Sequence, residues 1–137
     1  MGNTKSIGVA YSDQDLYGSD TIYVNGQLGY TTAAQGTVTQ LTSKSTAVTL
    51  NKSAGQITMN NASLATATNA TFTLNNTYLS NNDTVILTIA GGQATPGSYN
   101  VFANSVGNGT VSITLRNISG GTLSEAVVIN FAIIHCQ

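Results

Sequence analysis

The feature that most constrains the fold is a series of short runs in which apolar side chains alternate with Thr, Ser, Asn or Gln. These runs read TVTQLT, TAVTLN, ATFTLN, DTVILTIA and GTVSITLRN, at residues 37–42, 46–51, 70–75, 83–90 and 109–117. Because successive side chains of a β-strand point to opposite faces, the alternation predicts strands with one buried face. The other face carries small uncharged polar groups where a solitary soluble domain usually has Lys and Glu. We therefore expect a β-sheet protein whose surface lies against other protein.

Charged residues are scarce throughout the chain. They make up 7% of the 137 residues, against about 25% in a typical globular protein, and the formal net charge is -1. A hydrophobic fraction of 41% argues against disorder. A nearly uncharged surface provides little repulsion between copies, so we expect a homo-oligomer. Nucleic acid is not an expected partner, because only four cations, Lys5, Lys44, Lys52 and Arg116, could contact phosphates.

The chain divides into an N-terminal arm, residues 1–35, and a body, residues 36–137. The arm contains three of the five acidic residues, Asp13, Asp15 and Asp20, and its apolar residues are too few to fold alone. Asn25-Gly26, between TIYV and QLGY, is typical of a two-residue hairpin turn, so a small hairpin is predicted over 21–30. Residues 1–20 are predicted to form an extended arm that docks on a partner.

The body is predicted to be all-β. Strand candidates lie at 37–42, 46–51, 55–60, 70–75, 83–90, 97–106, 109–117 and 125–135, separated by Gly-, Asn- and Pro-containing turns. Short strands at this spacing indicate a single antiparallel β-sandwich of about eight strands. Both an immunoglobulin-like and a jelly-roll strand order accept this pattern.

Two of these segments are apolar on both faces. In the last segment, one face carries Val127, Ile129, Phe131 and Ile133, and the other carries Val128, Asn130, Ala132 and Ile134. In 83–90, Val85, Leu87 and Ile89 oppose Ile86, Thr88 and Ala90. Strands covered on both sides have this composition, so both segments are candidates for a subunit interface. The alternative is a central strand with a few exposed apolar residues, which is common in monomers.

Side chains that could perform chemistry are few, and we predict no enzyme, no catalytic residue and no cofactor. The single His135 is followed by the single Cys136, and neighbouring strand residues point to opposite faces, which separates them. Outside the arm the only acids are Asp83 and Glu125, both near predicted turns or strand starts, where solvation or capping is their ordinary role.

No metal site is predicted either. The stretch 13–18, DQDLYG, begins like a calcium-binding loop, but Tyr17 and Val24 occupy positions where that loop needs oxygen ligands. The sequence also shows no signal peptide and no run of about 20 apolar residues that would span a membrane. We therefore expect synthesis in the cytoplasm and no membrane partner.

Three stretches resemble a known group of proteins. GTVTQLTSKSTAVTLNKSAGQITM (36–59), LRNISGGTLSEAVVINFAII (115–134) and the arm's IGVAYSDQD (7–15) are similar to β-sandwich proteins on the virion surface of tailed, especially short-tailed, bacteriophages. The resemblance covers most of the body and part of the arm. It implies a structural protein attached to the outside of the virion as a head decoration, head fibre or tail fibre, commonly as a trimer and without an active site.

One arm and one compact body suit a decoration or cement protein best. Such a protein would be made in the host cytoplasm and would bind the phage's major capsid protein on the capsid exterior. The alternative is a short tail fibre or receptor-binding tip, for which a host glycan would be a possible partner. That alternative needs exposed aromatic rings, and Tyr78, Tyr99 and Phe102 are the candidates near loops, although such rings more often lie in the core.

Overall fold

The computed structural model describes residues 21 and 23–136 and places eight β-strands in them. A short 3-10 helix, η1 (Thr32–Ala34), precedes the first strand. The strands are β1 (Gln35–Thr39), β2 (Val48–Thr49), β3 (Ala54–Thr58), β4 (Asn69–Asn75), β5 (Thr84–Gly91), β6 (Tyr99–Gly107), β7 (Thr110–Asn117) and β8 (Val128–Ile134). Each of the eight predicted segments overlaps one of them, so the all-β prediction is confirmed.

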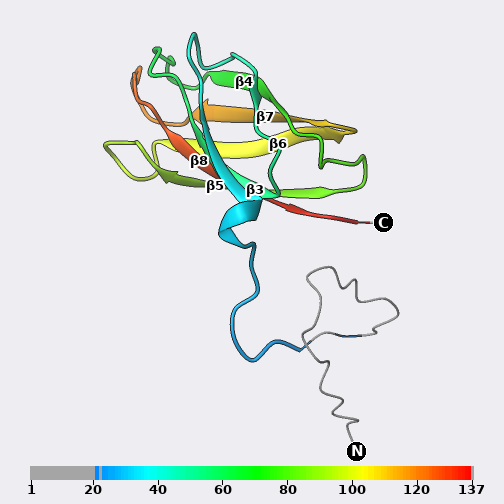
Figure 1. Ribbon diagram of the computed structural model, residues 1–137. Helices are drawn as coiled ribbons and strands as arrows, with labels where there is room; N and C mark the ends of the chain where they lie inside the picture. The colour runs from blue at the N-terminus through cyan, green and yellow to red at the C-terminus, as the bar shows by residue number, and fades with distance from the viewer. Residues whose placement is uncertain (1–20, 22, 137) are drawn as a thin grey trace, which may run out of the picture.

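The strands form two four-stranded sheets that lie one over the other (Figure 1). Sheet A has the order β1-β3-β8-β5, and sheet B has the order β2-β4-β7-β6. This arrangement is compatible with a β-sandwich.

The expectation that all strands are antiparallel is wrong, because both sheets are mixed. β1 and β3 pair in parallel, as do β2 and β4, while the other pairs are antiparallel. The chain passes from β1 in sheet A to β2 in sheet B and back to β3 in sheet A, so β1 and β3 run in the same direction. Alternation of side chains reports which face is buried and carries no information on strand direction.

The core fills the space between the sheets with apolar side chains from their inner faces. On β8 and just before it, Val127, Ile129, Phe131 and Ile133 are buried, as their spacing predicts. The other buried apolar residues are Val48, Ile57, Met59, Leu64, Ala70, Phe72, Leu74, Leu79, Tyr99, Val111, Ile113 and Leu115. This burial is the main contribution to stability.

The body also buries a lysine. Lys44 lies within the loop between β1 and β2, and its Nζ donates to the backbone oxygens of Asn60 at 2.6 Å and Glu125 at 2.5 Å. Burial lowers the pKa of Lys44, and the charge of Glu125 partly offsets this effect. Because the folded protein releases this proton more easily than the unfolded chain does, stability gains from Lys44 as the pH rises toward 10.5.

Tyr99 has the opposite alkaline behaviour. Its hydroxyl is buried without a hydrogen-bond partner in the described residues, and burial, followed by the nearby Glu125, raises the pKa of Tyr99 to about 12. Its ordinary value is 10.0. The resulting stability is complete below that value and is lost as the pH rises through about 12.

Tyr99→Phe is therefore expected to leave stability at pH 7 unchanged or to raise it by up to about 1 kcal/mol, because it removes an unpaired buried hydroxyl. Between pH 10 and 12 the variant should lose less stability than the wild type. Urea unfolding at pH 7 and at a pH between 10 and 12 measures both effects. The contribution of Lys44 to alkaline stability is the same in the two proteins, so it cancels in the comparison. A destabilised variant at pH 7 would show that the hydroxyl makes a favourable bond.

The predicted hairpin over 21–30 does not form in the described residues. The chain bends at Asn25-Gly26, but no strand occurs over 23–30. An isolated two-stranded hairpin is marginally stable in water without a further surface to cover it, and the described body supplies none for this segment. Residues 1–20, including the rejected calcium-loop pattern at 13–18, lie outside the described residues.

Candidate interaction surface

The outer face of sheet A presents rows of uncharged side chains that cross all four strands. The strand registers align Gln35, Ala54, Ala132 and Ile86 in one row and Thr37, Gln56, Asn130 and Thr88 in the next. None of the four strands contains a charged residue. A face without charge at its centre has the composition found at the buried cores of protein interfaces.

A groove of about 610 Å³ runs over this face. Its lining includes Tyr30, Ala54, Gln56, Ile86, Asn130 and Ala132. The segment 83–90 is predicted to be apolar on both faces, and its outward-facing Ile86 is 47% exposed to solvent. The same holds on β8, whose outer side chains are half-buried or exposed.

The polar groups of this face have few partners. In the described part of the chain, no side-chain hydrogen bond involves Thr37, Gln56, Thr88 or Asn130, and Asn130 Oδ1 is buried without a donor. Buried acceptors are nearly always paired in folded proteins. The exposed side chains of Thr37, Gln56 and Thr88 are therefore the groups that a partner could reach, whereas Asn130 Oδ1 is enclosed by the body itself.

Sheet B provides the contrast, because its outer polar side chains bond to one another. The hydroxyls of Thr71 and Thr114 lie 2.6 Å apart, and Asn104 Nδ2 donates to Thr114 Oγ1 at 2.6 Å. Arg116 donates to Asn69 Oδ1 at 3.2 Å. Several outer polar groups of sheet B thus bond to one another, whereas Thr37, Gln56 and Thr88 of sheet A have no such partner in the described residues.

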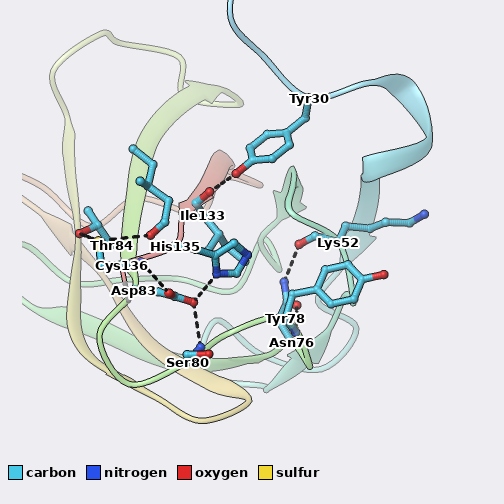
Figure 2. A network of polar contacts seen from close by, with 11 residues as sticks. Tyr30, Lys52, Asn76, Tyr78, Ser80, Asp83, Thr84, Ile133, His135 and Cys136 are labelled. Atoms are coloured by element: carbon cyan, nitrogen blue, oxygen red, sulfur yellow. Dashed lines mark hydrogen bonds and ion pairs between the residues drawn. The ribbon is translucent and has the colours of Figure 1, made fainter. Parts of the chain in front are cut away.

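Tyr30 sits at the margin of the groove, where the N-terminal segment meets the body. Its hydroxyl donates to the backbone oxygen of Ile133 on β8, and its own backbone oxygen accepts from Gln35 Nε2 at 2.9 Å. Figure 2 shows the ring directed toward Ile133. The chain that precedes Tyr30 is therefore anchored beside the groove.

The C-terminal end of β8 is held by a buried carboxylate. Asp83 Oδ2 accepts from the Ser80 amide at 2.8 Å and lies 2.9 Å from His135 Nδ1, while Oδ1 accepts from the Cys136 amide at 3.2 Å (Figure 2). The Ser80 amide is the largest cause of a lowered pKa for Asp83, with the Cys136 amide and His135 also contributing against desolvation. The ionised carboxylate ties the β4–β5 turn to the end of β8.

His135 and Cys136 do not form a pair, as the sequence predicts. The Cys136 thiol lies 3.8 Å from Thr84 Oγ1 and from the Ile134 oxygen, whereas the imidazole is bonded to Asp83. The role of Asp83 as a partner of both residues was not foreseen from the sequence, because they stand 52 and 53 positions away. Only the pairing of β5 with β8 brings them together.

Asp83→Asn is expected to lower the melting temperature at pH 7, because a neutral amide accepts the two backbone amides and His135 less strongly. Since the folded-state pKa is lowered, the stability from Asp83 is present above the ordinary value of 3.8 and is lost as the pH falls through the folded value. The difference between wild type and variant in thermal melts should therefore shrink toward acid. A difference that stays constant with pH would contradict this role.

The three aromatic candidates for a binding platform lie apart. Tyr99 is buried in the core, which is the more common place for such a ring, so it is not available as a binding platform. Phe102, on the outer face of sheet B, is 38% exposed, and Tyr78 is 50% exposed beside Lys52 and His135 in a second depression of about 550 Å³. The aromatic rings therefore do not form one stacking surface.

Neither a metal-binding cluster nor a membrane-spanning helix occurs among residues 21 and 23–136. No three His, Cys, Asp or Glu side chains gather there in a way that could hold a metal ion. No helix in that part of the chain has the length and apolar character needed to cross a membrane.

No protein-family model, curated protein or solved structure matches this chain.

Proposed function

We propose that this chain is a structural virion protein of a tailed bacteriophage, which decorates or cements the capsid exterior as a homo-oligomer. Its partners are sister copies, in a trimer, and the major capsid protein of the phage. It is made in the host cytoplasm and resides on the outside of the virion. In this role it binds protein and performs no catalysis.

The observation that carries the proposal is the outer face of sheet A. Within the described residues its central polar side chains make no hydrogen bond, its apolar Ile86 is 47% exposed, and its four strands bear no charge. Such a face favours a stable assembly with other protein over a free monomer in solution. The resemblance of 36–59 and 115–134 to virion-surface proteins supports the phage context.

The proposal is tested by imaging labelled protein on phage particles. Purified protein is added to particles stripped of their surface proteins and is located by electron microscopy. Regular decoration of the head supports the proposal. Binding only at the tail favours a short tail fibre or receptor-binding tip, for which the exposed rings of Tyr78 and Phe102 are the available contacts. Absence of binding to any part of the particle refutes both.

Deletion of residues 1–20 is expected to leave a folded body that no longer docks on the capsid. All buried apolar residues of the described core lie between Val48 and Ile133, so the melting temperature should change little. Co-sedimentation with capsids measures docking, and circular dichroism verifies the fold. Full occupancy by the truncated protein would show that the arm is not the docking element.

A further inference from the structure

We propose that the segment Tyr23–Leu28 of one copy fills the groove over sheet A of a neighbouring copy, so that the homo-oligomer is held together by exchanged arms. The inference rests on the homo-oligomeric part of the proposed function and identifies which two surfaces meet. It does not depend on which part of the virion the oligomer binds.

The segment carries apolar side chains that the described body leaves uncovered. Tyr23 is 90% exposed and Leu28 is 88% exposed, and Val24 between them is also exposed. Figure 1 shows that the chain before η1 runs away from the two sheets. A Cβ added at Gly26 or Gly29 would meet no atom within 4 Å. Transfer of tyrosine and leucine side chains out of water lowers the free energy. Binding of this segment to an apolar surface is therefore favourable.

The groove has the matching chemistry. It is apolar at Ile86, Ala54 and Ala132 and is wide enough, at about 610 Å³, to take more than one large side chain. Neither the groove strands nor the sequence TIYVNGQLGY (21–30) contains a charge, so no ion has to be desolvated on contact. An extended chain lying in the groove also brings backbone N–H and C=O groups, which can pair with the exposed side chains of Thr37, Gln56 and Thr88 along it.

The position of Tyr30 directs the segment toward the groove of a neighbouring copy and away from the groove of its own chain. Its hydroxyl is fixed to Ile133 at the groove margin, and Leu28 stands two residues before it. To enter the groove of its own chain, the segment would have to reverse direction at Gly29, whereas it leads outward from the body (Figure 1). A segment that leaves one groove and enters the next makes a heterologous contact, which closes into a ring when the rotation allows it. A three-membered ring is the trimer of the proposed function.

The test combines two variants of the full-length protein. Leu28→Asp places a charge in the arm segment, and Ala132→Arg places a charged side chain in the groove. Each variant alone should run as a monomer in size-exclusion chromatography with light scattering, because every contact needs one intact segment and one intact groove. Mixed in equal amounts, they should form a 1:1 dimer, because the Ala132→Arg protein has an intact segment and the Leu28→Asp protein has an intact groove.

A matched control is Thr73→Arg, which changes a residue in the middle of β4, on the outer face of sheet B, and should leave the oligomer intact. Melting temperatures close to that of the wild type confirm that all variants fold.

Three results overturn the inference: a monomeric wild type, either single variant remaining a full oligomer, or two monomeric variants that fail to associate when mixed. The last result would arise if the segment folded onto its own body. Capsid co-sedimentation of the wild type is measured in parallel, so that failure of arm exchange is separated from failure of the virion role.

Discussion

Phe72→Ala is expected to destabilise the protein by about 3–5 kcal/mol, the usual cost of truncating a buried aromatic ring. Phe72 lies in the middle of β4, is almost completely buried, and stands opposite Ile113 on β7 at the centre of the core. Removing its ring leaves a cavity between the two sheets that the surrounding side chains fill only partly. This is a large share of the stability of a domain of this size, which is typically about 5–15 kcal/mol.

Phe102→Ala provides the matched control. It removes the same ring from the outer face of sheet B, where Phe102 is partly exposed, and should cost less than about 1 kcal/mol. Urea unfolding of both variants measures the difference. The midpoint urea concentration should fall while the m-value, the slope of the unfolding free energy against urea concentration, stays constant. Similar losses in the two variants would mean that the sheets do not meet through the face that carries Phe72.

Asn117→Ala is expected to destabilise the protein by about 2–4 kcal/mol, because it removes three hydrogen bonds to the backbone. Asn117 ends β7 and is completely buried. Its Nδ2 donates to the backbone oxygens of Leu64 at 2.9 Å and Gly121 at 2.8 Å, and its Oδ1 accepts from the Ser119 amide at 2.9 Å. The side chain thus joins the β3–β4 and β7–β8 connections, and alanine removes all three bonds. The Leu64 oxygen keeps the Leu123 amide and the Gly121 oxygen keeps the Ser119 hydroxyl, so the Ser119 amide is the group left without its partner.

Two further variants separate this mechanism from a simple loss of volume. Asn117→Asp keeps the acceptor for Ser119 but loses both donors and places a carboxylate beside two carbonyl oxygens, so it should also destabilise. Asn100→Ala, at an exposed position on β6, should change stability by less than about 0.5 kcal/mol. If Asn117→Asp were as stable as the wild type, the amide donors would have no structural role.

The two outer faces explain why the sheets are expected to behave differently in an assembly. They look alike in the sequence, since both are rich in Thr, Ser and Asn. In sheet B the side chains are spaced so that Thr71, Thr114 and Asn104 satisfy one another. In sheet A the exposed side chains of Thr37, Gln56 and Thr88 line an apolar groove and make no side-chain hydrogen bond within the described residues. Hydrogen bonds between neighbouring strands depend on register, and register depends on which strands pair.

The sequence by itself determined the position of the eight strands and the burial of their apolar faces. Alternation with a period of two residues is a local property, and the burial of Val127, Ile129, Phe131 and Ile133 follows from it directly. It could not determine strand direction, because parallel and antiparallel strands bury the same alternate residues. It also overestimated the hairpin at Asn25-Gly26, since a turn signal without a covering surface does not stabilise a hairpin.

Only the tertiary structure brought distant residues into one place. Three features join residues that are far apart in the chain: the rows that cross sheet A, the attachment of Tyr30 to β8, and the contact of Asp83 with His135. The burial of Tyr99 and Lys44 was decided in the same way. These features arise from strand pairing and loop packing, which are set by the free energy of the whole fold rather than by any local run of residues.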